Sequence, residues 1–299
     1  MRLSDFFPTE QILRDGDFSA LGLSNSKGPE GMLSFLEDAR FAGELLDNPR
    51  VGAVICRPED GAAVAERKQG VVLSDTPRLA FFRLHNRLAE LPDYCPPQTP
   101  SVIPESCRVS PLAYIAPTGV VLGENVTVEE FVSIHGPCRI GDGCVLHAGV
   151  RLGGAGYEFK YFGDEVLDVT HCGSVELGKN VIIWDNAAIF RAVYPWDTTM
   201  IADNSRVDAH AHIAHGARIG KCTKIGAFAV IAGRVAVGDH AFIGPSAVVS
   251  NRIAVGDGAQ VLLGSVVTKG VPAGAVVSGN FAVDHAAHLA AVKAAARRD

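Results

Sequence analysis

Residues 201–231 read IADNSRVDAHAHIAHGARIGKCTKIGAFAVI, and isoleucine or valine stands at every sixth position of this stretch. The series continues unbroken to residue 267 as Ile201, Val207, Ile213, Ile219, Ile225, Ile231, Val237, Ile243, Val249, Val255, Val261 and Val267. The residue two positions earlier is mostly small, as in Ser205, Ala211, Ala217, Thr223, Ala229, Ala241, Ala247, Ala259 and Ser265. A helix would instead need apolar residues at steps of three and four. A six-residue unit with one large and one small inward side chain predicts a short strand and a corner. Three such units make one triangular turn of about 18 residues.

The same series extends over most of the chain after residue 100, with two interruptions. It includes Val109, Ile115, Leu122, Val128, Ile134, Ile140, Leu146, Leu152, Leu177, Ile183 and Ile189. Gly153 to Glu176 keep no six-step register, and Phe190 to Met200 place Pro195 in an aliphatic slot. We expect both segments to be loops that leave the coil, either as binding loops or as tolerated insertions. The pattern predicts a hexapeptide-repeat parallel β-helix, which is quasi-one-dimensional and needs capped ends.

The first third of the chain lacks the repeat and predicts a small α/β domain over residues 1–95. Its expected elements are helices over 35–46 and 77–91 and buried strands over 51–56 and 70–73. A proline-rich linker follows at 96–100, and the coil occupies 101–280. Residues 281–299 are expected to form a C-terminal helix with a basic tail of Lys293, Arg297 and Arg298.

Composition excludes several classes of protein. The 299 residues carry 27 Lys and Arg against 33 Asp and Glu, so the net charge of −6 argues against nucleic-acid binding. No apolar run is long enough to span a membrane, and residues 1–9 show no secretory signal. The seven cysteines are odd in number and form no Cys-x-x-Cys pair. We therefore expect reduced thiols and a cytoplasmic protein without a structural zinc ion.

His215 is the first candidate for chemistry. It follows the inward Ile213 by two positions, so its side chain is expected to point outward or to lie at a corner of the coil, where packing does not require it. One turn of 18 residues places Gly233 directly above it, where a glycine permits close approach of the backbone. The alternative interpretation is a surface histidine and an ordinary corner glycine.

Three features resemble a known family. They are the order of domains, the segment His-Ile-Ala-His-Gly-Ala-Arg-Ile-Gly at 212–220, and Leu-Ser-Phe-Leu-Glu-Asp-Ala-Arg-Phe at 33–41. The sequence resembles the UDP-3-O-acylglucosamine N-acyltransferases of lipid A synthesis (LpxD). The resemblance implies a left-handed coil, although crossover connections are usually right-handed.

The resemblance also implies roles for individual residues. In such enzymes a histidine at the position of His215 is the general base for an attacking amine. A glycine at the position of Gly233 donates its backbone N–H to the oxyanion. Phe35 and Phe41 match the aromatic residues that flank uracil, although they also fit an ordinary hydrophobic core. Asp38 stands where the family usually has asparagine. The remaining substrate-binding assignments are His212 and Arg252, the latter at a position that is histidine in the family.

One loop departs from the family pattern. The family reads Gly-Ala-Asp-Gly-Phe-Gly-Tyr there, and this chain has Gly-Gly-Ala-Gly-Tyr-Glu-Phe at 153–159. The family's aspartate is therefore Ala155 here.

These observations predict an acyltransferase that needs no cofactor. It would move an acyl group from acyl carrier protein or coenzyme A to the amine of a UDP-amino sugar. The resemblance implies a homotrimer whose clefts combine His215 and Gly233 of one chain with loop residues of its neighbour. The basic tail would suit an acidic carrier protein.

Three other functions remain open from the sequence. Residues 264–274 resemble the last turn of coenzyme A-dependent sugar acetyltransferases. The spacing of His210 and His215, with His212 between them, is similar to part of the zinc site of gamma-class carbonic anhydrases, which needs a third histidine. The third alternative is a trimer that binds sugar nucleotides without catalysis.

Overall fold

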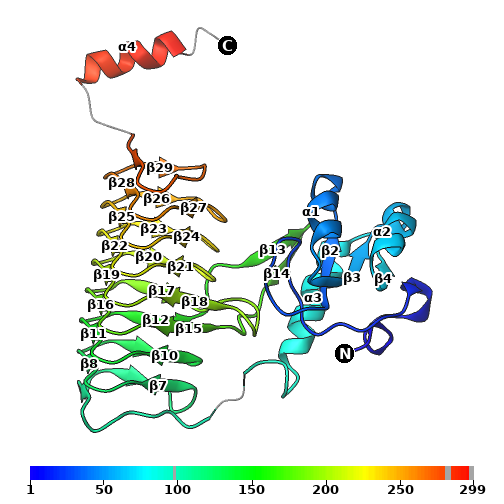
Figure 1. The fold of residues 1–299 in the computed structure, drawn as a ribbon, viewed down its shortest axis with the longest axis horizontal. Coiled ribbons are helices and arrows are strands. Elements are labelled where there is room, and N and C mark those ends of the chain that lie inside the picture. Colours follow the sequence, from blue (N-terminus) through cyan, green and yellow to red (C-terminus); the bar gives the residue numbers. More distant parts are fainter. Residues whose placement is uncertain (97–98, 280–283, 296–299) are drawn as a thin grey trace.

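The computed structural model describes residues 1–96, 99–279 and 284–295. It contains a tall parallel β-helix, a small α/β domain beside the coil, and a β-hairpin arm that reaches from the coil toward that domain (Figure 1). The predicted fold class, with a left-handed parallel β-helix after a small α/β domain, is confirmed.

Three parallel sheets form the faces of the coil. The first face contains β7 (Val120–Leu122), β10 (Cys138–Ile140), β15 (Ser174–Leu177), β18 (Thr198–Ile201), β21 (Arg218–Ile219), β24 (Ala236–Val237) and β27 (Ala254–Val255). The second contains β5 (Arg108–Val109), β8 (Thr127–Val128), β11 (Val145–Leu146), β16 (Ile182–Ile183), β19 (Arg206–Val207), β22 (Lys224–Ile225), β25 (Phe242–Ile243), β28 (Gln260–Val261) and β30 (Val276–Val277). The third contains β6 (Tyr114–Ile115), β9 (Ser133–Ile134), β12 (Arg151–Gly154), β17 (Ala188–Phe190), β20 (His212–Ile213), β23 (Val230–Ile231), β26 (Val248–Val249) and β29 (Val266–Val267).

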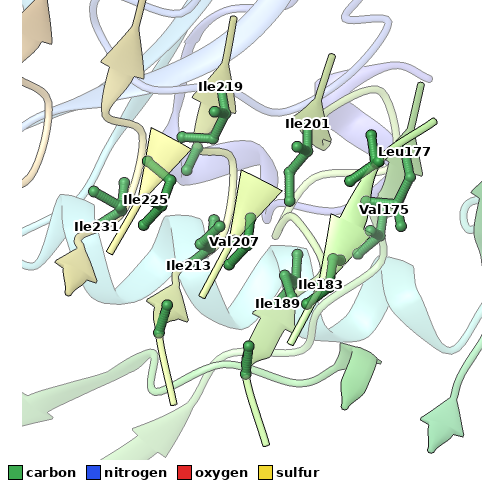
Figure 2. Packing of buried hydrophobic residues seen from close by; sticks show 14 of the residues in the cluster. Val175, Leu177, Ile183, Ile189, Ile201, Val207, Ile213, Ile219, Ile225 and Ile231 are labelled. Atoms are coloured by element: carbon green, nitrogen blue, oxygen red, sulfur yellow. The ribbon is translucent and has the colours of Figure 1, made fainter. Parts of the chain in front are cut away.

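The register between turns confirms the predicted period. Ile213 pairs with Ile231, and Ile231 with Val249, so successive turns are 18 residues apart. These aliphatic side chains are fully buried and point toward the coil axis, as Figure 2 shows for neighbouring positions. Each contributes roughly 1.5–3 kcal/mol of hydrophobic stabilisation. The small inward residues are buried as well, and the hydroxyl of Ser205 donates to the Gly220 carbonyl at 2.7 Å.

The two interruptions differ in how they affect the repeat. Ile140 pairs with Leu177, a separation of 37 that exceeds one turn by 19 residues, so the six-step register is lost. Leu177 pairs with Ile201, a separation of 24 that exceeds one turn by six, so the register survives and Pro195 fills the extra slot.

The interruptions are shorter than predicted, and the first is not an irregular loop. Strand β12 continues to Gly154, and β15 begins at Ser174, because both pair with strands of neighbouring turns. Between them, β13 (Phe159–Phe162) and β14 (Glu165–Asp168) form an antiparallel hairpin, which we call the arm. The second loop ends where β18 begins, at Thr198.

The small domain has a four-stranded sheet in the order β1 (Ile12–Arg14), β4 (Gly70–Leu73), β3 (Val51–Cys56) and β2 (Met32–Leu36). Its helices are α1 (Ala42–Asp47), α2 (Gly61–Arg67) and α3 (Pro77–Ala89), and its 3-10 segments are η1 (Leu3–Asp5), η2 (Thr9–Gln11), η3 (Ala39–Phe41) and η4 (Pro58–Asp60). The strands predicted over 51–56 and 70–73 are confirmed. The helix predicted over 35–46 is wrong in its first part, because Phe35 and Leu36 end a strand that pairs in parallel with β3.

The second loop attaches the small domain to the coil. Trp196 donates to the Leu21 carbonyl at 2.8 Å and stacks on Tyr194, with ring centroids 5.7 Å apart. Arg234, from the coil, lies over both rings and binds the Asp197 carboxylate at 2.9 Å. The hydrophobic core of the small domain includes Tyr194, so the two units share buried surface.

At the C-terminal end, α4 (His285–Ala295) lies beyond the last turn (Figure 1). Lys293 belongs to this helix, whereas Arg297 and Arg298 of the predicted basic tail lie outside the described residues. In the described part of the chain, no helix has the length and apolar character needed to cross a bilayer.

Candidate active site

His215 lies at a corner of the coil. Ile213 points into the core and is fully buried, and the chain turns at Gly216, which has a φ of +67°. The Gly216 N–H donates to the Thr199 hydroxyl at 2.8 Å, which holds the turn. The His215 side chain is outside the prism, with 20% of its surface exposed. Its imidazole can therefore meet a ligand at the outer edge of the coil.

Gly233 stands directly beside this ring, one turn above. A Cβ atom at position 233 would lie 2.6 Å from His215 Nε2, so a larger residue would displace the imidazole. The neighbouring Arg234 N–H donates to the His215 carbonyl at 3.0 Å, which fixes the vertical stacking. Among the described residues, the Gly233 N–H has no hydrogen-bond acceptor. It is available to a ligand oxygen next to the imidazole.

Glu158, just before the arm, reaches His215 from the side. Its Oε2 lies 3.3 Å from His215 Nε2, and its Oε1 forms an ion pair with Lys160. Burial favours the neutral acid, but hydrogen bonds from His215 and Lys160 outweigh it and lower the pKa of Glu158 to about 2. Sequence patterns did not indicate this residue. The Glu-x-Lys pair within an aromatic insertion is the signal that would have identified it.

His171 is a second residue that the sequence did not indicate. Its ring meets His215 edge-to-face, with centroids 5.9 Å apart, and its Nδ1 lies 3.0 Å from the Val169 carbonyl oxygen. Burial lowers its pKa to about 4, with a further contribution from His215, so the ring is neutral at pH 7. In that tautomer Nδ1–H donates to Val169, and the buried Nε2 has no partner among the described residues.

The predicted uracil residues line a cavity of about 330 Å³ between the small domain and the coil. Phe35 packs against Phe81 and Phe82 with centroid distances of 5.0 and 6.0 Å, so it is also part of the core. Phe41 lies at the opening with 45% of its surface exposed. We call this space the nucleotide cavity, after the predicted uracil residues that line it.

Asp38 lies on the wall of the nucleotide cavity and accepts a hydrogen bond from the Arg40 N–H at 2.9 Å. Its carboxylate also binds the Arg40 side chain at 2.6 Å. These hydrogen bonds lower the pKa of Asp38, so it remains an anion at neutral pH. Arg40 offsets the negative charge that an aspartate brings to this position.

A second hollow of about 460 Å³, which we call the groove, lies against the third face of the coil. Apolar side chains contribute much of its wall, among them Phe190, Val230 and Ala232. His212 also lines the groove and packs on Phe190 with centroids 4.9 Å apart. Desolvation lowers the pKa of His212, which favours its neutral form.

The nucleotide cavity and the groove meet at His215. Both hollows are lined by seven residues in common, namely Leu23, Arg78, Glu158, Lys160, His215, Arg234 and Arg252. Arg252 lies one turn above Arg234, and its N–H donates to the Gly233 carbonyl at 3.0 Å. The structure thus brings the predicted residues Phe35, Asp38, Phe41, His212, His215, Gly233 and Arg252 to one continuous cleft.

A loop of the chain itself contributes to the cleft. The contribution of loop residues from a neighbouring subunit stays a prediction. The chain's own segment from Gly156 to Lys160 lies beside His215, because α3 holds the arm in place. Arg83 binds Glu165 at 2.7 Å, and His85 Nε2 lies 2.8 Å from the Thr170 carbonyl oxygen.

The three histidines of the possible zinc site have different neighbours. His210 stacks on the exposed Phe228, whereas His212 packs on Phe190 and His215 on His171. Within residues 1–96, 99–279 and 284–295, no three His, Cys, Asp or Glu side chains gather as a metal site.

Comparison with known proteins agrees with this architecture. A family model described as Bacterial transferase hexapeptide (six repeats) matches residues 119–154 and 198–233. A UDP-3-O-acylglucosamine N-acyltransferase of Helicobacter pylori (strain ATCC 700392 / 26695) is 26% identical over 244 residues, covering 74% of this chain and 71% of the relative. The enzyme of the same name from Pseudomonas syringae pv. tomato is 28% identical over 235 residues, covering 70% of this chain and 65% of the relative.

The chain is a homologue of these N-acyltransferases. The resemblance inferred from the residues is thereby confirmed. A solved structure of Francisella novicida UDP-N-acetylglucosamine acyltransferase has a TM-score of 0.50 and 24% identity, covering 60% of this chain and 65% of that chain. It supports the shared coil fold.

Proposed function

We propose that the protein is an N-acyltransferase for a UDP-amino sugar, with an acyl thioester as donor. The contact between the His215 imidazole and the Gly233 backbone, at the point where two cavities meet, carries this proposal. A transferase needs a base, an oxyanion donor and access for two substrates at one place. The names of the homologues supply the substrate class.

The chemistry follows from the order of groups around His215. The imidazole accepts a proton from the acceptor amine while the amine nitrogen attacks the thioester carbonyl. The oxygen of that carbonyl then carries negative charge, and the free Gly233 N–H donates a hydrogen bond to it. The C–S bond breaks as the tetrahedral intermediate collapses, and the thiol leaves with a proton. Each role requires the close stacking of positions 215 and 233.

The nucleotide cavity is the proposed site of the UDP group. Phe35 and Phe41 offer aromatic surfaces for uracil, and such stacking contributes roughly 1–3 kcal/mol per base. Arg78 and Arg252 bring positive charge to the wall nearer His215, which suits the diphosphate. The sugar amine would then reach the imidazole from the side of the small domain.

The groove is the proposed site of the acyl thioester. Its apolar wall on the third face begins beside His215 and includes Ala214, Ala232 and Val230. An acyl chain would cover this surface while the thioester carbonyl faced Gly233. The donor is acyl carrier protein or coenzyme A in this proposal, in a homotrimer that acts in the cytoplasm. A coenzyme A-dependent acetyl transfer would use the same groups with a shorter chain.

Substitution of His215 tests the proposal directly. We expect His215→Ala to lower transfer about 10²–10⁴-fold, the usual contribution of a general base. His210→Ala is the matched control, because His210 lies at another corner and stacks on Phe228 away from both cavities. Transfer to UDP-amino sugars should be measured with acyl carrier protein and coenzyme A thioesters in parallel.

Two results would contradict this function. Unchanged transfer by His215→Ala would favour a non-catalytic role for the site. Failure of every uridine nucleotide to raise the thermal unfolding temperature would remove the sugar-nucleotide assignment. Stoichiometric zinc in protein purified without a metal-binding tag would instead favour the hydratase alternative.

A further inference from the structure

Glu158 is an acidic group among the seven described residues that line both the nucleotide cavity and the groove, four of which are arginine or lysine. Its Oε2 contacts His215 at 3.3 Å, and its side chain is 21% exposed. The residue belongs to the loop 153–159, just before the arm.

Positively charged side chains outnumber carboxylates around Glu158. Arg78, Lys160, Arg234 and Arg252 line both the nucleotide cavity and the groove. Among the described residues that line the groove, Glu158 is the only carboxylate. Its lowered pKa, about 2, keeps it ionised at neutral pH. A carboxylate that lines both cavities can receive a positive group of a ligand, while the arginines suit its phosphates.

The position of the carboxylate coincides with the expected position of the reacting amine. An acceptor nitrogen must lie within hydrogen-bond reach of the imidazole and beside the Gly233 amide. Glu158 Oε2 lies 3.3 Å from His215 Nε2, so a nitrogen placed there would lie next to the same carboxylate. An ammonium can then donate to Oε2 in place of the His215 N–H, and the neutral imidazole keeps a lone pair on Nε2 for the proton.

Lys160 shows which kind of group this carboxylate binds. Its ammonium forms an ion pair with Oε1 while it lies over the Phe82 ring, 4.9 Å from the centroid. The side chain of Lys160 is only 12% exposed, so the ion pair is largely shielded from solvent. Hydrogen bonds between ionised partners are stronger than neutral ones.

We propose that Glu158 binds the protonated amine of the acceptor and selects an amino sugar over the corresponding hydroxyl sugar. This inference rests on the proposed function. The bound ammonium loses one proton to His215, which passes it to the departing sulfur. The N–C bond forms and the C–S bond breaks, and the second nitrogen proton leaves through His215 to solvent. Glu158 accepts hydrogen bonds throughout and is not consumed.

Direct binding of two matched nucleotides tests this selection. UDP-glucosamine and UDP-glucose differ in having an amine or a hydroxyl at one carbon. Isothermal titration at pH 6.5 should show that the wild-type protein prefers UDP-glucosamine. We expect Glu158→Gln to reduce that preference at least tenfold, because the amide keeps the shape but loses the charge. Glu37→Gln is the control, since Glu37 lines the nucleotide cavity but is not among the residues that line the groove.

The outcomes separate this inference from the function on which it depends. An unchanged preference in Glu158→Gln overturns the role of Glu158 while the proposed function stands. Absence of binding of either nucleotide to the wild-type protein overturns the proposed function and this inference with it. If Glu158→Gln does not fold, Glu158→Ala must lose the preference and Glu158→Asp must retain part of it.

Discussion

At the scale of single residues, the site depends on a glycine whose missing side chain leaves room for a ring. Gly233 contributes an N–H that has no acceptor among the described residues, and a space that the His215 imidazole fills. The backbone of the next residue, Arg234, ties the two positions together through its bond to the His215 carbonyl. The chemistry therefore depends on one close contact between adjacent turns.

Substitution of Gly233 tests that contact. A methyl group at this position would lie 2.6 Å from Nε2, so Gly233→Ala should turn the imidazole away. We expect kcat to fall by at least tenfold while circular dichroism and the unfolding temperature change little, because the site is at the edge of the coil. Gly270→Ala is the control, since a Cβ there would meet only the Ala254 carbonyl oxygen at 3.5 Å. Equal activity in the two variants would contradict the proposed stacking.

At the scale of elements, most two-residue strands of the coil have one inward and one outward side chain. In β23, Ile231 is fully buried between Ile213 and Val249, and Val230 lines the groove. A two-residue strand thus divides its functions, because successive side chains point to opposite faces. The inward residue stabilises the coil, and the outward residue is available for ligand contact.

Alanine substitution in β23 should separate these two functions. Ile231→Ala leaves a cavity in the coil and should lower the free energy of unfolding by about 2–5 kcal/mol. Val230→Ala should change stability by less than about 1 kcal/mol and raise the KM for the acyl donor, because it removes apolar surface from the groove. Chemical denaturation and donor kinetics measure the two effects. A large loss of stability in Val230→Ala, without an effect on KM, would contradict this assignment.

At the scale of the whole molecule, two buried neutral histidines lie where the small domain, the arm and the coil meet. His85 of α3 contacts Thr170, and His171 packs on His215. Burial lowers the pKa of both, to about 4 for His171. A lowered pKa means that the unfolded chain binds protons more readily than the folded one. Stability is therefore complete above the ordinary value of 6.5 and decreases as the pH falls toward 4.

Acidification should show this loss as a change in the free energy of unfolding. Between pH 7 and pH 5, His171 alone should account for a decrease of about 2 kcal/mol. His171→Gln cannot titrate at this position, so its stability should depend less steeply on pH over that range. The exposed His240, at a corner of the coil, provides a control as His240→Gln. Identical pH slopes for the wild type and His171→Gln would contradict the assignment.

The sequence determined the coil because its period is a local property that each turn repeats. Large aliphatic residues at every sixth position suit an axis shared by three short strands, and the second insertion preserved that register by being six residues long. The strand at 51–56 and the helix from Pro77 could be predicted for the same reason. So could the stacking of Gly233 on His215, which needs only the period of 18.

The tertiary structure determined the features that the six-residue repeat does not specify. Met32 to Leu36 form a strand because β3 offers a parallel partner, although the segment from Phe35 onward has a helical pattern. Glu158 and His171 reach His215 only because the arm is held against α3 by contacts such as that of His85 with Thr170. These contacts join residues far apart in the chain, where no local pattern specifies which side chains meet.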